Sequence, residues 1–193
     1  MRVLKGLFAA ALLTAWAQVP AATPDHQLDA VLAQLAMRQH GHVEFIEQHF
    51  LAVLDHPIES SGDMRYDAPD RLEKRTLSPH RETLLLAGGI LTVDKGKTHR
   101  VVDLHAYPQV QPFVESIRAT LAGDRAALER LFTLEFVGSL PKWSLTLLPK
   151  DPKVKRTVAQ VRIDGVQDQL SKVEIRQPDG DRSVLTLRPS PAP

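Results

Sequence analysis

The second half of the chain consists of short runs in which apolar and polar residues alternate, and this pattern restricts the fold more than any other feature. From residue 134 onward the runs are "LEFVG", "WSLTLLP", "TVAQVRIDG", "SKVEIRQ" and "RSVLTLRP", separated by Pro, Gly and Asp residues. A period of two places the apolar side chains on one face of a strand, and such turn residues join neighbouring antiparallel strands. The pattern therefore predicts an antiparallel sheet with one apolar face.

Similar runs occupy much of the first half. Strands are predicted at 62–66 and 71–77, joined at Ala68-Pro69-Asp70, where proline fixes a turn. A hairpin that closes at Lys95-Gly96 is predicted between 90–93 and 100–106. The segment 43–58 fits the spacing of a strand and of a helix nearly equally well, and we interpret it as a strand.

Two segments have helical spacing. Residues 23–39 carry an apolar stripe, and Asp25 is the predicted N-cap of the helix. Residues 109–132 carry a second stripe, which Gly123 interrupts and Asp124 can cap again. The two segments are too few to surround a wide sheet, but they can cover one of its faces.

The predicted fold class is mainly β (α+β): an unclosed antiparallel β-barrel of about ten strands, with an N-terminal helix and mid-chain helices over the concave apolar face. A concave face that the helices do not fill leaves an apolar cavity. The candidate ligand-binding residues are the apolar ones predicted to line it: Phe45, Met64, Tyr66, Leu72, Leu84, Leu86, Val102, Leu104, Trp143, Leu145, Leu147, Val161, Ile163, Val173, Ile175, Leu185 and Leu187. Phe113, Ile117 and Leu121 are predicted lid contacts, with permanent core packing as the alternative.

The N-terminus has the pattern of a secretory signal peptide. Arg2 and Lys5 precede an uncharged run that is too short to be a stable membrane anchor. Cleavage is expected after Ala17 or Ala21, which makes 1–21 the signal peptide and 22–189 a single domain, followed by a disordered tail at 190–193. The mature protein is expected to be soluble and periplasmic, and without cysteine it cannot be lipidated at a cysteine.

The charge balance offers no general attraction to polyanions. The full chain has 24 Lys and Arg against 23 Asp and Glu, and loss of the leader leaves 22 against 23. This balance gives no overall basic footprint for binding nucleic acid or an anionic membrane. Apolar residues make up 43% of the chain but aromatic residues only 5%, so the predicted interior is aliphatic.

Few residues suggest catalysis or a metal site. His40, His42 and His49 could approach one another, but a metal site would need further ligands and supporting hydrogen bonds. The Ser60-Ser61-Gly62 stretch lacks the spacing of a nucleophile elbow. We therefore expect no enzyme, no metal and no cofactor.

The order of these elements resembles the family of the lipoprotein carrier LolA and its LolA-like relatives. The resemblance is carried by "FIEQ" at 45–48, by 61–64 leading through Pro69 into "RLEKRTLSP", and by "LAGDRAALERLF" and "DGDRSVLTL" in the second half. It covers nearly the whole mature chain. The family has an arginine directly before the proline of this turn, which helps to hold the lid; here that residue is Ala68.

The resemblance implies a monomeric periplasmic carrier that shields acyl chains of a lipid or lipoprotein, without catalysis, between an inner-membrane exporter and an outer-membrane acceptor. The missing arginine makes a lipid or polyene-type cargo an alternative to lipoprotein. A second possible function is a periplasmic sensor or adaptor that binds lipid or lipoprotein and signals to a membrane partner. Either function could use an exposed edge strand, which we expect near 153–158, for docking by strand addition.

Overall fold

The computed structural model describes residues 24–108 and 111–190. The predicted signal peptide at 1–21 and residues 191–193 of the predicted tail lie outside this range. Within it, eleven strands form one antiparallel sheet. The strands are β1 (His40–Phe50), β2 (Ile58–Asp67), β3 (Arg71–Ser78), β4 (Glu82–Ala87), β5 (Ile90–Lys95), β6 (Thr98–Asp103), β7 (Phe132–Ser139), β8 (Lys142–Pro149), β9 (Gln160–Val166), β10 (Gln169–Arg176) and β11 (Arg182–Pro189).

The strand order is β6-β5-β4-β3-β2-β1-β11-β10-β9-β8-β7, so almost all neighbours in the sheet are also neighbours in the chain. The exception is the pairing of β1 with β11, which joins the two halves of the sequence. The edge strands β6 and β7 do not pair with each other, and the sheet is not closed. This confirms the predicted mainly β, unclosed antiparallel architecture.

The ambiguous segment 43–58 is a strand only in its first part. β1 ends at Phe50, and residues 51–57 form the loop to β2. Strand pairing decides the conformation, because β1 lies in the centre of the sheet and hydrogen-bonds to β2 on one side and β11 on the other. Tertiary pairing of this kind overrides a weak local preference.

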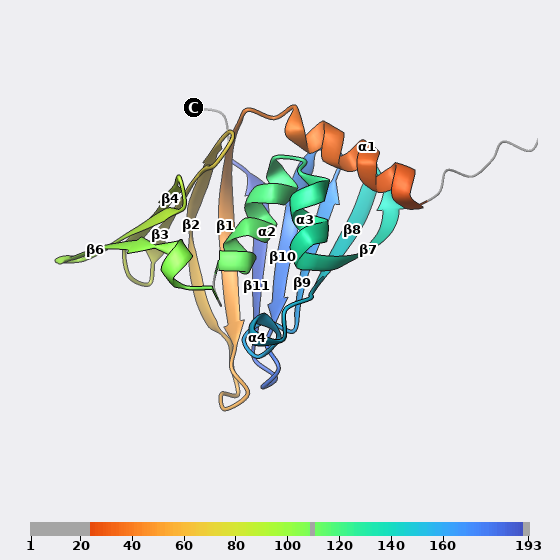
Figure 1. The fold of residues 1–193 in the computed structure, drawn as a ribbon. Coiled ribbons are helices and arrows are strands. Elements are labelled where there is room, and N and C mark those ends of the chain that lie inside the picture. The colour runs from red at the N-terminus through yellow and green to blue at the C-terminus, as the bar shows by residue number, and fades with distance from the viewer. Residues whose placement is uncertain (1–23, 109–110, 191–193) are drawn as a thin grey trace, which may run out of the picture.

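Three helices cover the β7–β11 half of one face of the sheet (Figure 1): α1 (Pro24–Ala36), α2 (Gln111–Leu121) and α3 (Arg125–Leu131). Asp124 caps α3 as predicted, since its carboxylate accepts a hydrogen bond from the amide of Ala127 at 2.9 Å. The prediction that Asp25 is the N-cap is wrong, because Asp25 lies inside the first turn of α1. A negative charge there still complements the helix dipole.

Two further predictions are wrong in their local structure. β6 ends at Asp103, and Leu104 begins a 3-10 helix, η1 (Leu104–Ala106), because the Asp103 carboxylate accepts the amide of His105 at 2.9 Å. The expected edge strand near 153–158 is instead the short helix α4 (Pro152–Lys155), which Asp151 caps at 2.6 Å from the amide of Lys153. The edges of the sheet are β6 and β7.

The main hydrophobic core lies between the helices and strands β7–β10. Its helical side consists of Leu28, Val31, Leu32 and Leu35 of α1 with Ala119, Ala127 and Leu128, and its sheet side centres on Trp143, Leu145, Leu147, Val161 and Ile163. No helix within the described residues is long and apolar enough to span a membrane.

Candidate functional site

The strand register places every predicted lining residue in a strand on the face that the helices cover. Phe45 pairs with Leu187, and Val173 pairs with both Ile163 and Leu185. The same face continues in the other direction through Tyr66, which pairs with Leu72, and then through Leu86. The concave face is therefore one continuous, mostly apolar surface across the sheet. Whether these residues bind a ligand stays a prediction.

The two halves of this face differ in how fully they are covered. Leu147, Val161 and Ile163 are completely buried under the helices, so this half is packed core. Phe113 and Ile117 pack against it from α2, while Leu121 is half-buried and lies outside that cluster. In the β2–β6 half, Met64, Leu72, Leu84 and Val102 are only half-buried.

A cavity of about 270 Å³ lies where α2 meets the β2–β6 half. Leu86 of β4, Leu104 of η1 and Val114 of α2 are its apolar lining residues. The other lining residues are Asp70, Gly88, Gly89, His105, Gln111, Glu115 and Arg118. Leu86 and Leu104 were predicted from the sequence. The α2 residues were not, because their helical stripe did not show which strands α2 would face.

Arg118 brings α2 to the turn between β2 and β3. Its guanidinium forms a two-point ion pair with Glu115, at 2.8 and 2.5 Å, and lies close enough to Tyr66 to influence its ionisation. Burial raises the pKa of the Tyr66 hydroxyl; the positive charge of Arg118 opposes this rise and the carboxylate of Asp70 adds to it. The Tyr66 hydroxyl donates to the carbonyl of Pro69 at 3.4 Å. An arginine is thus present near this turn, but it comes from the helix and not from position 68.

A partly buried ion pair lies on the concave face. Glu47 of β1 binds the ammonium group of Lys74 of β3, and their side chains are only 13% and 20% exposed. Ser183 donates to Glu47 at 3.1 Å, and Lys74 lies 4.8 Å from the centre of the Phe45 ring. Burial alone would raise the pKa of Glu47, but the charge and hydrogen bond of Lys74 reverse this, and the net pKa is lowered.

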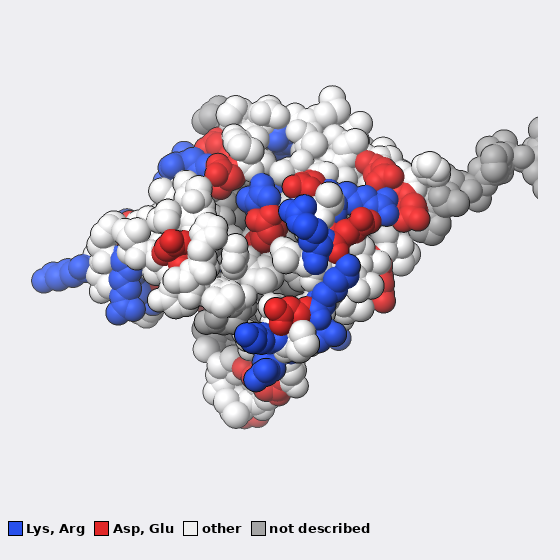
Figure 2. Space-filling view, viewed as in Figure 1, with Lys and Arg blue, Asp and Glu red and all other residues white. Residues whose placement is uncertain are grey.

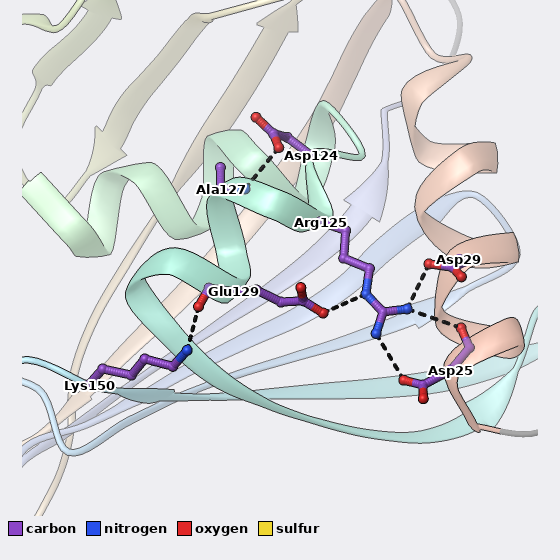
Figure 3. Close-up of polar contacts among 7 residues, drawn as sticks. All are labelled: Asp25, Asp29, Asp124, Arg125, Ala127, Glu129 and Lys150. Atoms are coloured by element: carbon purple, nitrogen blue, oxygen red, sulfur yellow. Dashed lines mark hydrogen bonds and ion pairs between the residues drawn. The ribbon is translucent and has the colours of Figure 1, made fainter.

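Arg125 fastens α1 to α3 (Figure 3). Its guanidinium contacts Asp29 at 2.8 Å and Asp25 at 2.9 Å, both on α1, and Glu129 of α3 at 2.7 Å. These three carboxylates raise the pKa of Arg125, with Asp29 and Glu129 as the largest contributors. Lys150 adds a hydrogen bond to the carbonyl oxygen of Glu129 at 2.5 Å. The cover over the core is therefore held by ion pairs as well as by apolar packing.

The histidines of the first strand do not converge. His40 lies 2.9 Å from Asp67, His42 lies 3.5 Å from Asp63, and His49 lies 3.4 Å from Glu47. Each histidine thus has its own carboxylate neighbour on the sheet. Within the described residues, no three His, Cys, Asp or Glu side chains are grouped so that they could hold a metal ion.

The opposite face of the sheet has a hollow of about 390 Å³ over β1, β2, β3 and β11. Its side chains are mostly charged or hydroxylated, and they include Glu44, Asp63, Arg75 and Arg188. Arg75 binds Asp63 at 2.7 Å. Ile46 and Leu77 also line the hollow, so it combines charged and apolar side chains.

An unclosed antiparallel sheet with helices over one apolar face defines a class of fold in which ligands can lie between sheet and helices. A family model described as outer membrane lipoprotein carrier protein LolA-like matches residues 20–189. The chain belongs to this LolA-like family, which confirms the resemblance found in the sequence. Comparison with curated protein sequences gives no match.

Among solved structures, a LolA superfamily protein from Nitrosomonas europaea is 13% identical and has a TM-score of 0.44; the match covers 90% of this chain and 96% of that one. One chain in the structure of the Pseudomonas aeruginosa MucA/MucB complex is 16% identical to this chain, with a TM-score of 0.45. The match covers 86% of this chain and 58% of that one. A DUF1329 family protein from Desulfovibrio piger is 10% identical with a TM-score of 0.41, over 87% and 92% of the two chains.

Proposed function

We propose that the protein is a non-catalytic periplasmic carrier that holds the acyl chains of a lipid or lipoprotein against its concave face and shields them from water. Membership of the LolA-like family supports this function. The observation that carries it is that the helices cover one continuous apolar face unequally. They bury the β7–β10 half, whereas Met64, Leu72 and Leu84 in the other half are only half-buried.

The proposed binding energy comes from hydrocarbon burial. Each buried methylene contributes about 0.8 kcal/mol, so a long chain needs no specific polar contact to be retained. The cavity of about 270 Å³ beside α2 would be the entry point. A whole chain requires more room, and a displacement of α2 away from β3–β5 would supply it.

Release would follow the same path in reverse. A partner that offers a better apolar surface would draw the chains out when α2 is displaced. In this proposal the donor is an inner-membrane exporter and the acceptor an outer-membrane protein. The predicted signal peptide at 1–21 supports placement between the two membranes.

The test begins with the protein expressed with its own leader and purified from periplasm without detergent. Native mass spectrometry and lipid extraction then identify what co-purifies. We expect a defined acylated species at close to one molecule per protein. An empty protein that also fails to take up a fluorescent fatty acid would contradict the carrier function and favour the adaptor.

Leu84 and Leu85 offer a matched pair of variants. They are adjacent in β4 and both half-buried, but Leu84 faces the concave surface and Leu85 the opposite one. Leu84→Asp should lower the occupancy strongly, and Leu85→Asp should leave it near the wild-type level. Substitutions in Leu145 or Ile163 are less informative, because both are fully buried core residues whose replacement would unfold the protein.

A further inference from the structure

The segment around α4 forms a basic surface that the charge balance of the whole chain conceals. We define the α4 platform as Arg130, Lys150, Lys153, Lys155 and Arg156. From residue 150 to residue 162 the only acidic residue is Asp151, and its carboxylate caps α4 at the amide of Lys153. Figure 2 shows basic side chains gathered around α4, in the lower centre of the view.

The fold exposes these cations by anchoring the residues between them. Val154 and Val158 are 3% and 7% exposed, and Val158 belongs to the core under the helices. Burial of the two valines turns Lys153, Lys155 and Arg156 towards solvent. The amide of Lys150 donates to the carbonyl of Leu131 at 2.9 Å, which brings the end of α3, and with it Arg130, beside α4.

The platform carries uncompensated charge. Among the described residues, none of its five side chains lies within ion-pair distance of a carboxylate. Glu129, the nearest acid in sequence to Arg130, is bound by Arg125 at 2.7 Å. Many other cations do have acidic partners, for example Arg38 with Asp168 and Arg176 with Glu174.

An exposed aliphatic loop lies at the same end of the molecule (Figure 1). In the β1–β2 loop, Val53 is 88% exposed and Leu54 is 46% exposed. Two hydrogen bonds connect this loop to α4 through the end of β10: Ala159 donates to the carbonyl of Arg176 at 2.8 Å, and the amide of Ala52 donates to Asp181 at 2.7 Å.

We propose that the α4 platform docks the protein on an anionic lipid bilayer, with the β1–β2 loop touching the membrane interface at the edge of the contact. A bilayer provides both anionic headgroups and an apolar interface, so it complements both features. An acidic protein segment would complement only the basic platform and not the aliphatic loop. The platform lies on the helix-bearing side of the sheet, so docking would turn α2 and its cavity towards the membrane.

Acidic residues limit the role of the loop. Asp55 follows Leu54 directly, and Asp179 and Asp181 lie in the adjoining β10–β11 turn. Their charges keep the loop from entering an anionic surface deeply. The lysines and arginines of the platform therefore carry most of the binding, and the aliphatic side chains add a smaller part. Docking does not depend on the identity of any cargo.

The experiment is sedimentation of the mature protein with lipid vesicles. One set contains phosphatidylcholine alone, and in the other about one lipid in three is phosphatidylglycerol. We expect binding to the anionic vesicles and little to the neutral ones. Raising salt from about 0.1 M to about 1 M should abolish binding, because the Debye length falls from about 10 Å to about 3 Å.

Matched variants locate the contact. Each basic residue near an anionic surface contributes about a fivefold factor in binding, so Lys153→Gln, Lys155→Gln and Arg156→Gln together should lower it roughly 100-fold. The control removes the same number of charges from the far end of the sheet with Arg81→Gln, Lys97→Gln and Arg100→Gln, and should change binding by less than about threefold. Val53→Ser should weaken binding by less than the platform triple variant does.

Trp143 fluorescence verifies that each variant is folded. If the triple variant fails to fold, Lys155→Gln and Arg156→Gln are measured as single variants. Each should lower vesicle binding about fivefold. Several outcomes would overturn the proposal: no binding to either vesicle, equal losses in the platform and control variants, or binding that salt leaves unchanged. Binding to polyglutamate but not to vesicles would also overturn it and would favour an acidic protein partner.

Discussion

Arg125 and Asp29 lie 96 residues apart in the sequence, yet their side chains form an ion pair of 2.8 Å that joins α3 to α1. Asp25 and Glu129 complete the cluster around the same guanidinium. The carboxylates are half or more exposed, so solvent screens each contact. The cluster stabilises the fold because several charges act together as a network. It holds the N-terminal helix in register over the core.

We predict that Arg125→Ala lowers the free energy of unfolding by about 1 kcal/mol, because several partly exposed ion pairs are lost together. Hydrogen exchange in α1 should accelerate more than exchange in β8 or β9. Arg130→Ala is the control: it removes an arginine from the same helix that has no ion-pair partner among the described residues. Equal effects of the two substitutions on α1 would show that the cluster does not fasten the helix.

Glu47 should make stability depend on pH. Its pKa in the folded protein is lowered from the ordinary value of 4.5, so the folded state binds a proton less readily than the unfolded state. The stabilisation is therefore present above about pH 4.5 and is lost as the pH falls through the lower, folded-state pKa.

The measurement for Glu47 is urea unfolding at pH 7 and at several values below 4.5. Glu47→Gln should show a smaller loss of unfolding free energy on acidification than the wild type. Glu44→Gln removes a carboxylate from an exposed position of the same strand and controls for the general effect of charge. An unchanged acid dependence in Glu47→Gln would show that the Lys74 pair contributes no net stabilisation.

The turn between α2 and α3 requires glycine at position 123 for two reasons. Its φ angle is +69°, and a Cβ atom there would lie 2.5 Å from the carbonyl oxygen of Leu32. Gly123→Ala should therefore cost about 3 kcal/mol, from backbone strain and displacement of α1. In Gly96→Ala, φ is +60° but nothing lies within 4 Å of the new Cβ, and about 1 kcal/mol is expected. Thermal or urea unfolding of the two variants compares them directly.

The face of each strand could be predicted from the sequence because alternation has a period of two. An error of one residue would have turned a strand over, and none of the strand residues predicted to line the cavity is turned over. The division of that face into packed core and partly open surface could not be predicted. It depends on where α1, α2 and α3 dock, and an amphipathic stripe shows that a helix is buried without showing what it is buried against.

Short local signals explain the remaining differences. An edge strand is predicted near "KVKRTV", but its two apolar residues, Val154 and Val158, are four positions apart, which is a helical spacing. The preceding Asp151-Pro152 pair is also a typical N-cap followed by proline at the first helical position. That signal could have predicted α4. The proximity of Arg118 to Tyr66 had no such signal, because it depends on the position of α2 beside the β2–β3 turn.

The position of α2 over this turn can be tested through the ionisation of Tyr66. The sequence contains two tyrosines, Tyr66 and Tyr107, so in a Tyr107→Phe background the absorbance change at alkaline pH reports Tyr66 alone. Burial is the main cause of its raised pKa, the charge of Arg118 lowers it, and that of Asp70 raises it. Arg118→Gln should therefore move the pKa of Tyr66 upward and Asp70→Asn should move it downward. If Arg118→Gln leaves the titration unchanged while Asp70→Asn shifts it, then α2 is displaced from the turn in solution, and the cavity beside it is open without a ligand.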